Sequence, residues 1–281
     1  MSDAQIQRYA AFTENPDHGN PAGVWMGEEL PAPRDMLEIA ADIGYSETAF
    51  LAPAGGRERI VRYFSPEAEV PFCGHATIAS GVALGLAEGD GTFLLSTRAG
   101  DIPVTVRRQG AYFEASLTSV DPRHEPAAAR LTTAALDCLG WSSDELDPQF
   151  PVVRAYAGAW HLLVIAATRD RLARLDYDFE RMKSLMLEHD LTTLQLAWRE
   201  SNTQYHSRNP FPVGGVVEDP ATGAAAAALG GYLRNAGLVE APVSLEIRQG
   251  EDMGRPSLIR VGIPATGGIV VTGAAVRIGN S

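Results

Sequence analysis

The sequence has few cysteines and no long hydrophobic run. Cys73 and Cys138 are the two cysteines in 281 residues, so we expect no disulfide framework. Cys138 lies in an apolar helical pattern and is expected in the core. No stretch of 18 or more apolar residues occurs, which predicts no transmembrane helix. Residues 1–8 lack the basic and apolar regions of a signal peptide, so a cytoplasmic protein is expected.

Positive charge is also scarce. The chain has 23 Lys and Arg against 35 Asp and Glu, a formal net charge of −12, and Lys183 stands almost alone among arginines. Such a surface repels nucleic acids and anionic membranes, and no Lys/Arg cluster interrupts it. We therefore expect neither kind of partner.

The common cofactor motifs are missing as well. The sequence contains no Walker loop, no Gly-x-Gly-x-x-Gly after a predicted strand and no Gly-x-Ser-x-Gly elbow. The spacing of His and Cys residues is not that of a zinc site. Neither a metal nor a nucleotide cofactor is therefore indicated.

What is present is the composition of a globular protein in two similar halves. Hydrophobic residues make up 45% and charged residues 21% of the chain. Each half shows strands, one small-residue helix after a glycine turn, and further strands. The Pro-, Ala- and charge-rich segment 121–129 is the best candidate for a linker. We predict an N-terminal lobe at 1–122 and a C-terminal lobe at 123–281 that arose by a diverged duplication, with room for the last strands to pack back onto the N-terminal lobe.

Two helix starts stand out, one in each half. Segment 71–77 opens an apolar helix that runs to about Leu86, and segment 218–223 opens an alanine-rich helix that stops at Gly237, a typical C′ glycine. The first turn of a helix presents unpaired N–H groups and the positive end of the macrodipole. Two such starts suggest one anion held by two lobes.

At the first start, Gly74 permits a close backbone approach. His75 could donate to an anion or shuttle a proton, or it could merely be a capping residue. Cys73 could be a thiolate of lowered pKa near a helix N-terminus, or a buried core residue. At the second start, Asp219 or Thr222 could cap the helix, which is the structural alternative to a role in binding.

Two further segments carry candidate polar groups. Tyr45 to Leu51 is predicted to be a strand, and Glu47 within it faces either solvent or a pocket, where it would serve as an acid/base. The segment 20–23 is most simply a turn, with the alternative that the Asn20 side chain binds a ligand carboxylate.

Taken together, these motifs resemble one family. Asn20-Pro-Ala-Gly-Val24, Ser46-Glu-Thr-Ala-Phe50, Phe72-Cys-Gly-His-Ala-Thr77, Gly215 to Gly223 and Gln249 to Ser257 are similar to the successive signatures of the PhzF-like (phenazine biosynthesis) isomerases. They occur in the family's order and span residues 20 to 257.

The resemblance implies an α+β fold of the diaminopimelate-epimerase type. Two lobes each wrap a strongly curved, barrel-like mixed sheet around a central helix, and the active site lies between them. It further implies a homodimer, and cofactor-free proton transfer on a small carboxylate substrate. Glu47 would be the general acid/base, assisted by His75 and Asp219. The substrate-binding residues implied are Asn20, Ser46, Cys73, Gly74, Ala76, Thr222, Gly223 and Ala224.

Two departures from the sequence patterns of related proteins limit the reactions and substrates that we expect. The related epimerases use two facing cysteines, and here Cys73 occupies the first place while Asp219 stands near the second, which argues against a thiol pair. The family often has Gly-Ser-Ala after the threonine, whereas this chain has Gly223-Ala224-Ala225, so a substrate-binding hydroxyl is missing. The alternatives are a Cys73-dependent racemase or epimerase and a non-catalytic carboxylate-binding protein.

Overall fold

The computed structural model describes residues 6–279 in two compact units. Within the described range, unit 1 comprises residues 6–118 and 272–279, and unit 2 comprises residues 119–271. Residues 1–5, most of the N-terminal segment 1–8 in which no signal peptide is expected, lie outside it. No helix in the described range is long and apolar enough to cross a bilayer.

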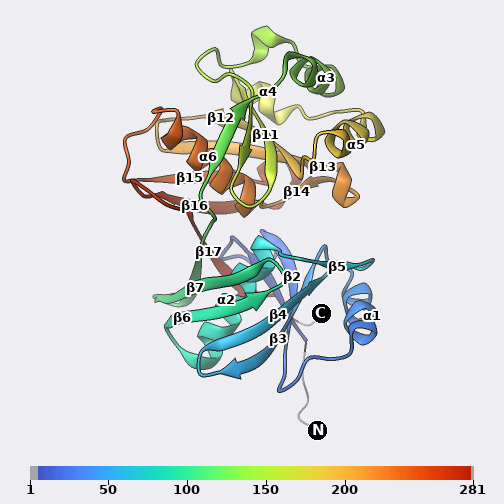
Figure 1. Cartoon of the computed structure of the whole chain (residues 1–281), viewed down its shortest axis with the longest axis vertical. Coiled ribbons are helices and arrows are strands. Elements are labelled where there is room, and N and C mark those ends of the chain that lie inside the picture. Colours follow the sequence, from blue (N-terminus) through green and yellow to red (C-terminus); the bar gives the residue numbers. More distant parts are fainter. Residues whose placement is uncertain (1–5, 280–281) are drawn as a thin grey trace. The chain divides into compact units, whose positions relative to one another are not determined.

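Unit 1 is a closed sheet around one helix. Its elements are β1 (Gln7–Ala11), β2 (Asn20–Met26), α1 (Pro33–Ile43), β3 (Thr48–Gly55), β4 (Glu58–Phe64), β5 (Glu69–Val70), α2 (Gly74–Glu88), β6 (Gly91–Thr97), β7 (Gly100–Gln109) and β8 (Tyr112–Thr118), with β17 (Val270–Arg277) entering from unit 2. The pairing runs β1–β2–β3–β4–β6–β7–β8–β17 and returns to β1. The β2–β3 and β4–β6 pairs are parallel. Figure 1 shows these strands curving around α2.

Helix α2 fits inside this sheet because its residues are small. It contacts strands β1, β2, β3, β7 and β8, and residues 75–85 are buried without interruption. A Cβ at Gly81 would lie 2.8 Å from the side chains of both Ala115 and Val104. Glycine at this position therefore lets the helix approach β7 and β8 closely. The Gly/Ala composition that identified the helix is also what allows it to be enclosed.

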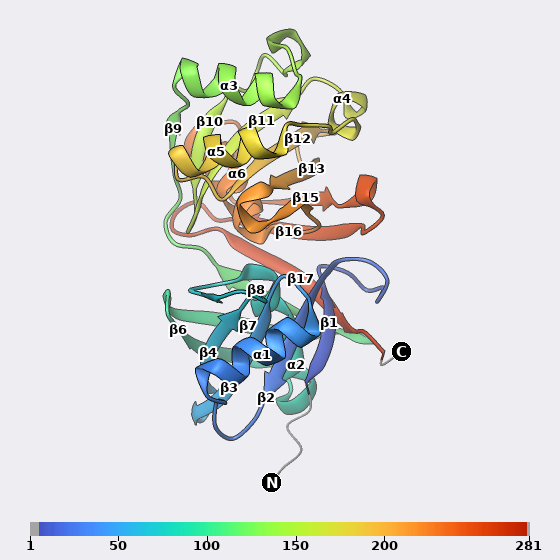
Figure 2. The ribbon, with the colours of Figure 1, turned by 90° about the vertical axis from the view of Figure 1, so that its right-hand side faces the viewer.

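On the outside of unit 1, α1 covers part of the sheet. Pro33 occupies the first turn and Gly44 ends the helix with φ 69°, the left-handed conformation that favours glycine. Met36 and Ala40, four residues apart, form a buried cluster with Trp25, Phe50 and Phe64. Figure 2 shows α1 across the face of these strands.

Unit 2 repeats the plan with more helices. Its elements are β9 (Arg123–Pro126), α3 (Ala129–Leu139), β10 (Val153–Tyr156), β11 (Trp160–Ala166), α4 (Arg169–Ala173), α5 (Phe179–Glu188), β12 (Thr193–Arg199), β13 (Gln204–Phe211), β14 (Val216–Asp219), α6 (Gly223–Asn235), β15 (Val243–Gln249) and β16 (Ser257–Ile263), with short 3-10 turns at Ser143–Glu145, Pro212–Gly214 and Glu251–Met253. Helix α6 contacts β9, β10, β11, β12 and β16, while α3 and α5 pack together on a second core that contains Cys138.

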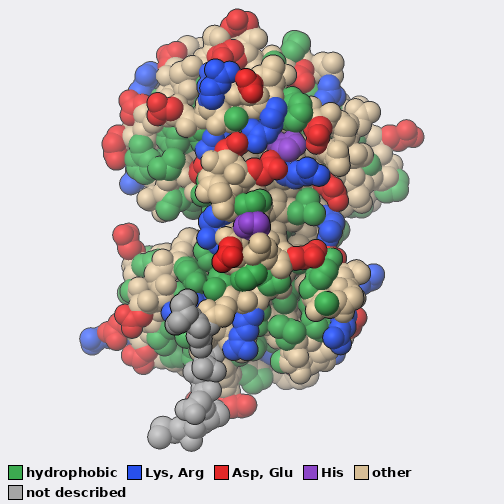
Figure 3. All heavy atoms as spheres, turned by 180° about the vertical axis from the view of Figure 1, so that it is seen from behind, with side chains coloured by type: hydrophobic (Ala, Val, Ile, Leu, Met, Phe, Trp, Pro, Cys, Tyr) green, Lys and Arg blue, Asp and Glu red, His purple; other side chains and the backbone are tan. Residues whose placement is uncertain are grey.

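This architecture confirms the predicted α+β fold, in which a barrel-like sheet encloses a central helix. Gly237 has φ 68° just after α6, as a C′ glycine should. The linker prediction for 121–129 was wrong in part, because residues 123–126 form β9 and pair with β10. On the face in Figure 3, acidic and basic side chains are interspersed.

Candidate active site

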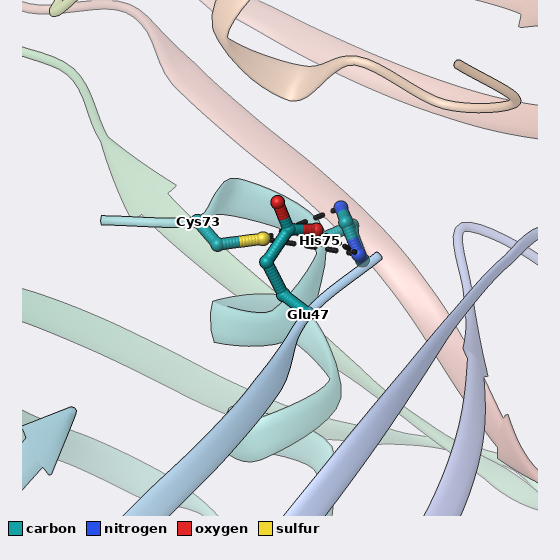
Figure 4. A group of neighbouring side chains, drawn as sticks. All are labelled: Glu47, Cys73 and His75. Carbon is teal, nitrogen blue, oxygen red and sulfur yellow. Dashed lines mark hydrogen bonds and ion pairs between the residues drawn. The ribbon is translucent and has the colours of Figure 1, made fainter. Parts of the chain in front are cut away.

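Three polar side chains from two segments of unit 1 point toward one another (Figure 4). Glu47 directly precedes β3, whereas Cys73 and His75 lie at the start of α2. One carboxylate oxygen of Glu47 is 3.4 Å from Nε2 of His75. The Cys73 Sγ is 3.4 Å from Nδ1 and 3.8 Å from Nε2 of the same ring. His75 is thus the centre of a Glu–His–Cys group.

The neighbouring residue Ser46 adds a fourth contact. Its hydroxyl lies 3.4 Å from Nε2 of His75, on the same ring nitrogen that faces Glu47. The His75 side chain is 7% exposed and that of Glu47 is 16% exposed. The carboxylate therefore remains reachable while most of its surroundings are protein.

Glu47 is placed by a turn rather than by a strand. The predicted strand 45–51 was wrong at its beginning, because β3 starts at Thr48 and helix α1 ends only at Gly44. The carbonyl of Glu47 nevertheless accepts a hydrogen bond from the Gly23 amide of β2 at 3.2 Å. This bond fixes the main chain at Glu47. Because Glu47 lies outside the strand, its side chain does not follow the alternating directions of strand side chains and points toward α2.

The start of α2 leaves its first N–H groups available. Cys73 is the N-cap residue in an extended conformation and makes no side-chain capping hydrogen bond. The imidazole of His75 contacts Glu47, Ser46 and Cys73, as given above, so the simple capping interpretation does not describe it. A Cβ added at Gly74 would meet nothing within 4 Å. Open space therefore lies next to backbone donors that a helix cannot satisfy by itself.

A buried pair of hydroxyl groups, those of Tyr63 and Thr77, stabilises this helix start. Thr77 donates from its hydroxyl to the Cys73 carbonyl at 2.7 Å, and the Tyr63 hydroxyl lies 2.7 Å from the same Thr77 oxygen. Burial raises the pKa of Tyr63 well above its usual value, so the phenol stays neutral. The pair holds the carbonyl of Cys73 and hence the position of its thiol.

The second helix start, in unit 2, is built differently. Thr222 is the N-cap of α6, yet it makes no capping hydrogen bond to the helix. Its hydroxyl instead donates to a carboxylate oxygen of Asp219 at 2.6 Å. The alternative in which the Thr222 side chain caps the helix is therefore not what the structure shows, because its hydroxyl bonds to Asp219 instead.

Gln249 holds this turn together and was not singled out as a site residue by sequence reasoning. Its amide nitrogen donates to the Asp219 carbonyl at 2.7 Å and to the Thr222 hydroxyl at 3.0 Å. Its amide oxygen accepts from the backbone N–H of Thr222 at 3.2 Å. Gln249 is 1% exposed, at the end of β15. Only its place at the head of a quoted motif pointed to it.

The carboxylate beside Asp219 has a separate partner. Glu218 accepts from Nε of Arg208 at 2.9 Å and also from its Nη2, and Arg208 Nη1 donates to the Ala173 carbonyl at 2.7 Å. The Arg208 side chain is 10% exposed and the Glu218 side chain is 6% exposed, so the ion pair is buried. The structure thus shows Arg208 committed to the ion pair with Glu218.

The remaining predicted residues lie as follows. Asn20 begins β2, is 1% exposed and pairs with Ala11 of β1. The turn predicted for 20–23 was wrong, because these residues begin strand β2. Proline has no N–H to donate, but it is tolerated near the beginning of a strand, where that hydrogen bond is not required. Ala76 lies in the first turn of α2, and Gly223 and Ala224 open α6. The structure thus gathers Ser46, Glu47, Cys73 and His75 in unit 1, and Asp219 and Thr222 in unit 2.

The fold and this chemistry define a class, the isomerases built on the diaminopimelate-epimerase-like fold. The sequence profile of the phenazine biosynthesis-like protein family matches residues 9–280. The chain belongs to this family.

Individual relatives agree with this assignment. The chain is 33% identical to a trans-2,3-dihydro-3-hydroxyanthranilate isomerase of Pseudomonas fluorescens over 251 residues, 89% of this chain and 86% of the relative. It is 29% identical over 286 residues to the isomerase YfhB of Bacillus subtilis strain 168, covering 98% and 97% of the two chains. A crystal structure of a PhzF-family protein from Bacillus anthracis superposes with a TM-score of 0.86 at 23% identity, over 99% of this chain and 98% of the other. The chain is an isomerase of this family.

Proposed function

We propose that this isomerase moves a proton within a small carboxylate substrate by general acid/base catalysis and without a cofactor. Glu47 removes a proton from a carbon next to a carbonyl or unsaturated system, and the electron pair of the broken C–H bond enters that system. The proton on Glu47 exchanges with solvent, and the exchanged proton is then returned to a different carbon, so the substrate is isomerised with no net change in composition.

The observation that carries this proposal is the contact of 3.4 Å between Glu47 and Nε2 of His75. A general base must be reachable by substrate and oriented by a neighbour. The Glu47 side chain, 16% exposed, meets the first condition, and the more deeply buried His75 meets the second.

The helix starts supply the complementary charge. The first N–H groups of α2 and the open space beside Gly74 suit a substrate carboxylate or an enolate-like oxygen. Asp219 would orient the substrate, since Thr222 and Gln249 fix its turn. Substrate specificity would differ from that of relatives with a serine at the position of Ala224.

The test uses isotope exchange. A panel of small unsaturated carboxylates, with trans-2,3-dihydro-3-hydroxyanthranilate among them, is incubated with the enzyme in D2O. We expect deuterium in the product for any substrate that turns over, and a loss of about 10² to 10⁴ in rate for Glu47→Gln, the usual contribution of a general base. Glu67→Gln, a change at an exposed glutamate, is the matched control.

A second candidate function rests on the thiol. Because Cys73 Sγ lies 3.4 Å from Nδ1 of His75, a Cys73-dependent racemase or epimerase has an imidazole in place to take the thiol proton, which leaves a thiolate to act as the base. Cys73→Ala separates the two functions. A loss in rate as large as that of Glu47→Gln would favour the thiol mechanism, and a loss below about tenfold would exclude it, given the typical contribution of a catalytic base.

A further inference from the structure

We propose that Glu47, Cys73 and His75 also form a Zn²⁺ site, and that bound zinc blocks the isomerase. Sequence spacing did not point to this site, since the ligands come from a loop and from a helix start 26 residues apart. The binding part of the proposal stands on geometry alone. The blocking part rests on the proposed function of Glu47.

The distances between the ligand atoms match a tetrahedral metal. Zinc binds nitrogen at about 2.0–2.1 Å, sulfur at about 2.3 Å and oxygen at about 2.0–2.2 Å, so tetrahedral angles place N and S about 3.6 Å apart and N and O about 3.3 Å apart. Here Nε2 of His75 lies 3.8 Å from Sγ of Cys73 and 3.4 Å from Oε2 of Glu47. All three ligand atoms lie within 4.8 Å of one another. Sγ lies nearer Nδ1 than Nε2 in this rotamer, so a rotation of the imidazole that turns the Nε2 lone pair toward Sγ and Oε2 would complete the geometry.

The charges of the three ligands also suit a divalent soft cation. One thiolate and one carboxylate together offset the two positive charges of Zn²⁺, and a neutral imidazole completes the set. The positive end of α2 opposes a cation but favours the Cys73 thiolate that binds it. The thiolate makes zinc the preferred ion over Mg²⁺ or Ca²⁺, which take oxygen ligands.

Three protein ligands leave one position of the tetrahedron open. Water could fill that position, unlike in a closed structural zinc site, where four protein ligands hold the ion. A bound ion would occupy the lone pairs of Glu47 and His75, so neither group could accept a proton. Zinc at this site would therefore act as a reversible inhibitor.

Direct binding is tested on the full chain after treatment with a chelator. Competition with a chromophoric zinc indicator should show one ion per chain, and Co²⁺ added in place of zinc should give a thiolate-to-cobalt charge-transfer band. Cys73→Ser should abolish the band and weaken zinc binding at least about 100-fold, since even the loss of a residue that only hydrogen-bonds to a metal ligand costs about 10- to 100-fold. His75→Gln should weaken zinc binding similarly and covers the case in which Cys73→Ser does not fold. Cys138→Ala, which removes the other cysteine, is the matched control and should retain both the band and the affinity.

The two parts of the proposal fail separately. Absence of zinc binding, or a charge-transfer band that survives Cys73→Ser, would overturn the site whatever the activity. Zinc that binds through these residues but leaves turnover unchanged would overturn the blocking role and would also contradict Glu47 as the base. Zinc inhibition that chelator reverses in wild type would support both parts.

Discussion

His161 should make the stability of unit 2 depend on pH in a defined way. This residue of β11 is fully buried, and its Nδ1 lies 2.8 Å from the hydroxyl of Thr193. Thr193 donates its own proton to Asn209 at 2.8 Å, so Nδ1 of His161 must be the donor in the first contact. The other nitrogen, Nε2, is buried and has no hydrogen-bond partner within the described residues. A second proton would have to enter there with nothing to accept it.

The magnitude follows from the pKa. Burial lowers the pKa of His161 from 6.5 to about 3. Between these values the unfolded chain binds a proton that the folded chain does not, so the free energy of unfolding rises with pH in this window. The stabilisation is fully present above pH 6.5 and is lost as the pH falls toward 3. Each pH unit is equivalent to about 1.4 kcal/mol, which gives a loss of about 2 kcal/mol between pH 7.5 and pH 5.

The assay compares wild type with His161→Gln, which keeps a polar side chain but cannot titrate. Urea unfolding is followed by tryptophan fluorescence, since Trp141, Trp160 and Trp198 all lie in unit 2. The other histidines and the carboxylates contribute to both curves and cancel in the difference. The stability difference between the two proteins should shift by about 2 kcal/mol from pH 7.5 to pH 5. Parallel curves over this range would refute the assignment of a neutral, locked imidazole.

Two further predictions concern the packing around α2 and the ion pair just before α6. Glu218→Gln leaves the buried Arg208 guanidinium without its charge partner and should lower the free energy of unfolding in urea by about 3–5 kcal/mol. The double variant Arg208→Met, Glu218→Leu removes both charges and should recover most of that loss. Equal losses in the two proteins would contradict the role of the charge. Gly81→Ala places a methyl group 2.8 Å from Ala115 and Val104 and should cost about 1–3 kcal/mol, whereas Gly74→Ala, with open space around it, should not destabilise the fold. A Gly81→Ala protein as stable as wild type would show that α2 can move away from the sheet.

The two enclosed helices and most strand ends were predictable because their determinants are local and repeated, whereas the sheet that encloses each helix was implied by the family resemblance. Glycine and alanine at helical spacing in 74–88 and 223–235 marked the two enclosed helices, and turn residues marked most strand ends. The boundaries that failed depend on tertiary pairing. Asn20 is in a strand because β1 pairs with it, and 123–126 form β9 because β10 does.

The site was predictable in part, for a similar reason. Motifs identify Glu47, Cys73, His75 and Asp219 as residues, but no pattern in the chain states that Glu47 and His75 lie 3.4 Å apart. Gln249 was missed because a buried glutamine that bonds to backbone and side chain across 27 residues leaves no local signal. The sequence could not show that Arg208 binds Glu218, since the sequence pattern around an arginine on a strand is the same whether its side chain faces a ligand or a carboxylate.

The central claim is that Glu47 transfers the proton. The most direct measurement is the rate at which solvent deuterium enters a turned-over carboxylate substrate, for wild type, Glu47→Gln and the control Glu67→Gln. Wild type and the control should incorporate deuterium at the rate of turnover, and Glu47→Gln should be slower by about 10² to 10⁴ in both exchange and isomerisation. Full exchange and turnover by Glu47→Gln would contradict the claim.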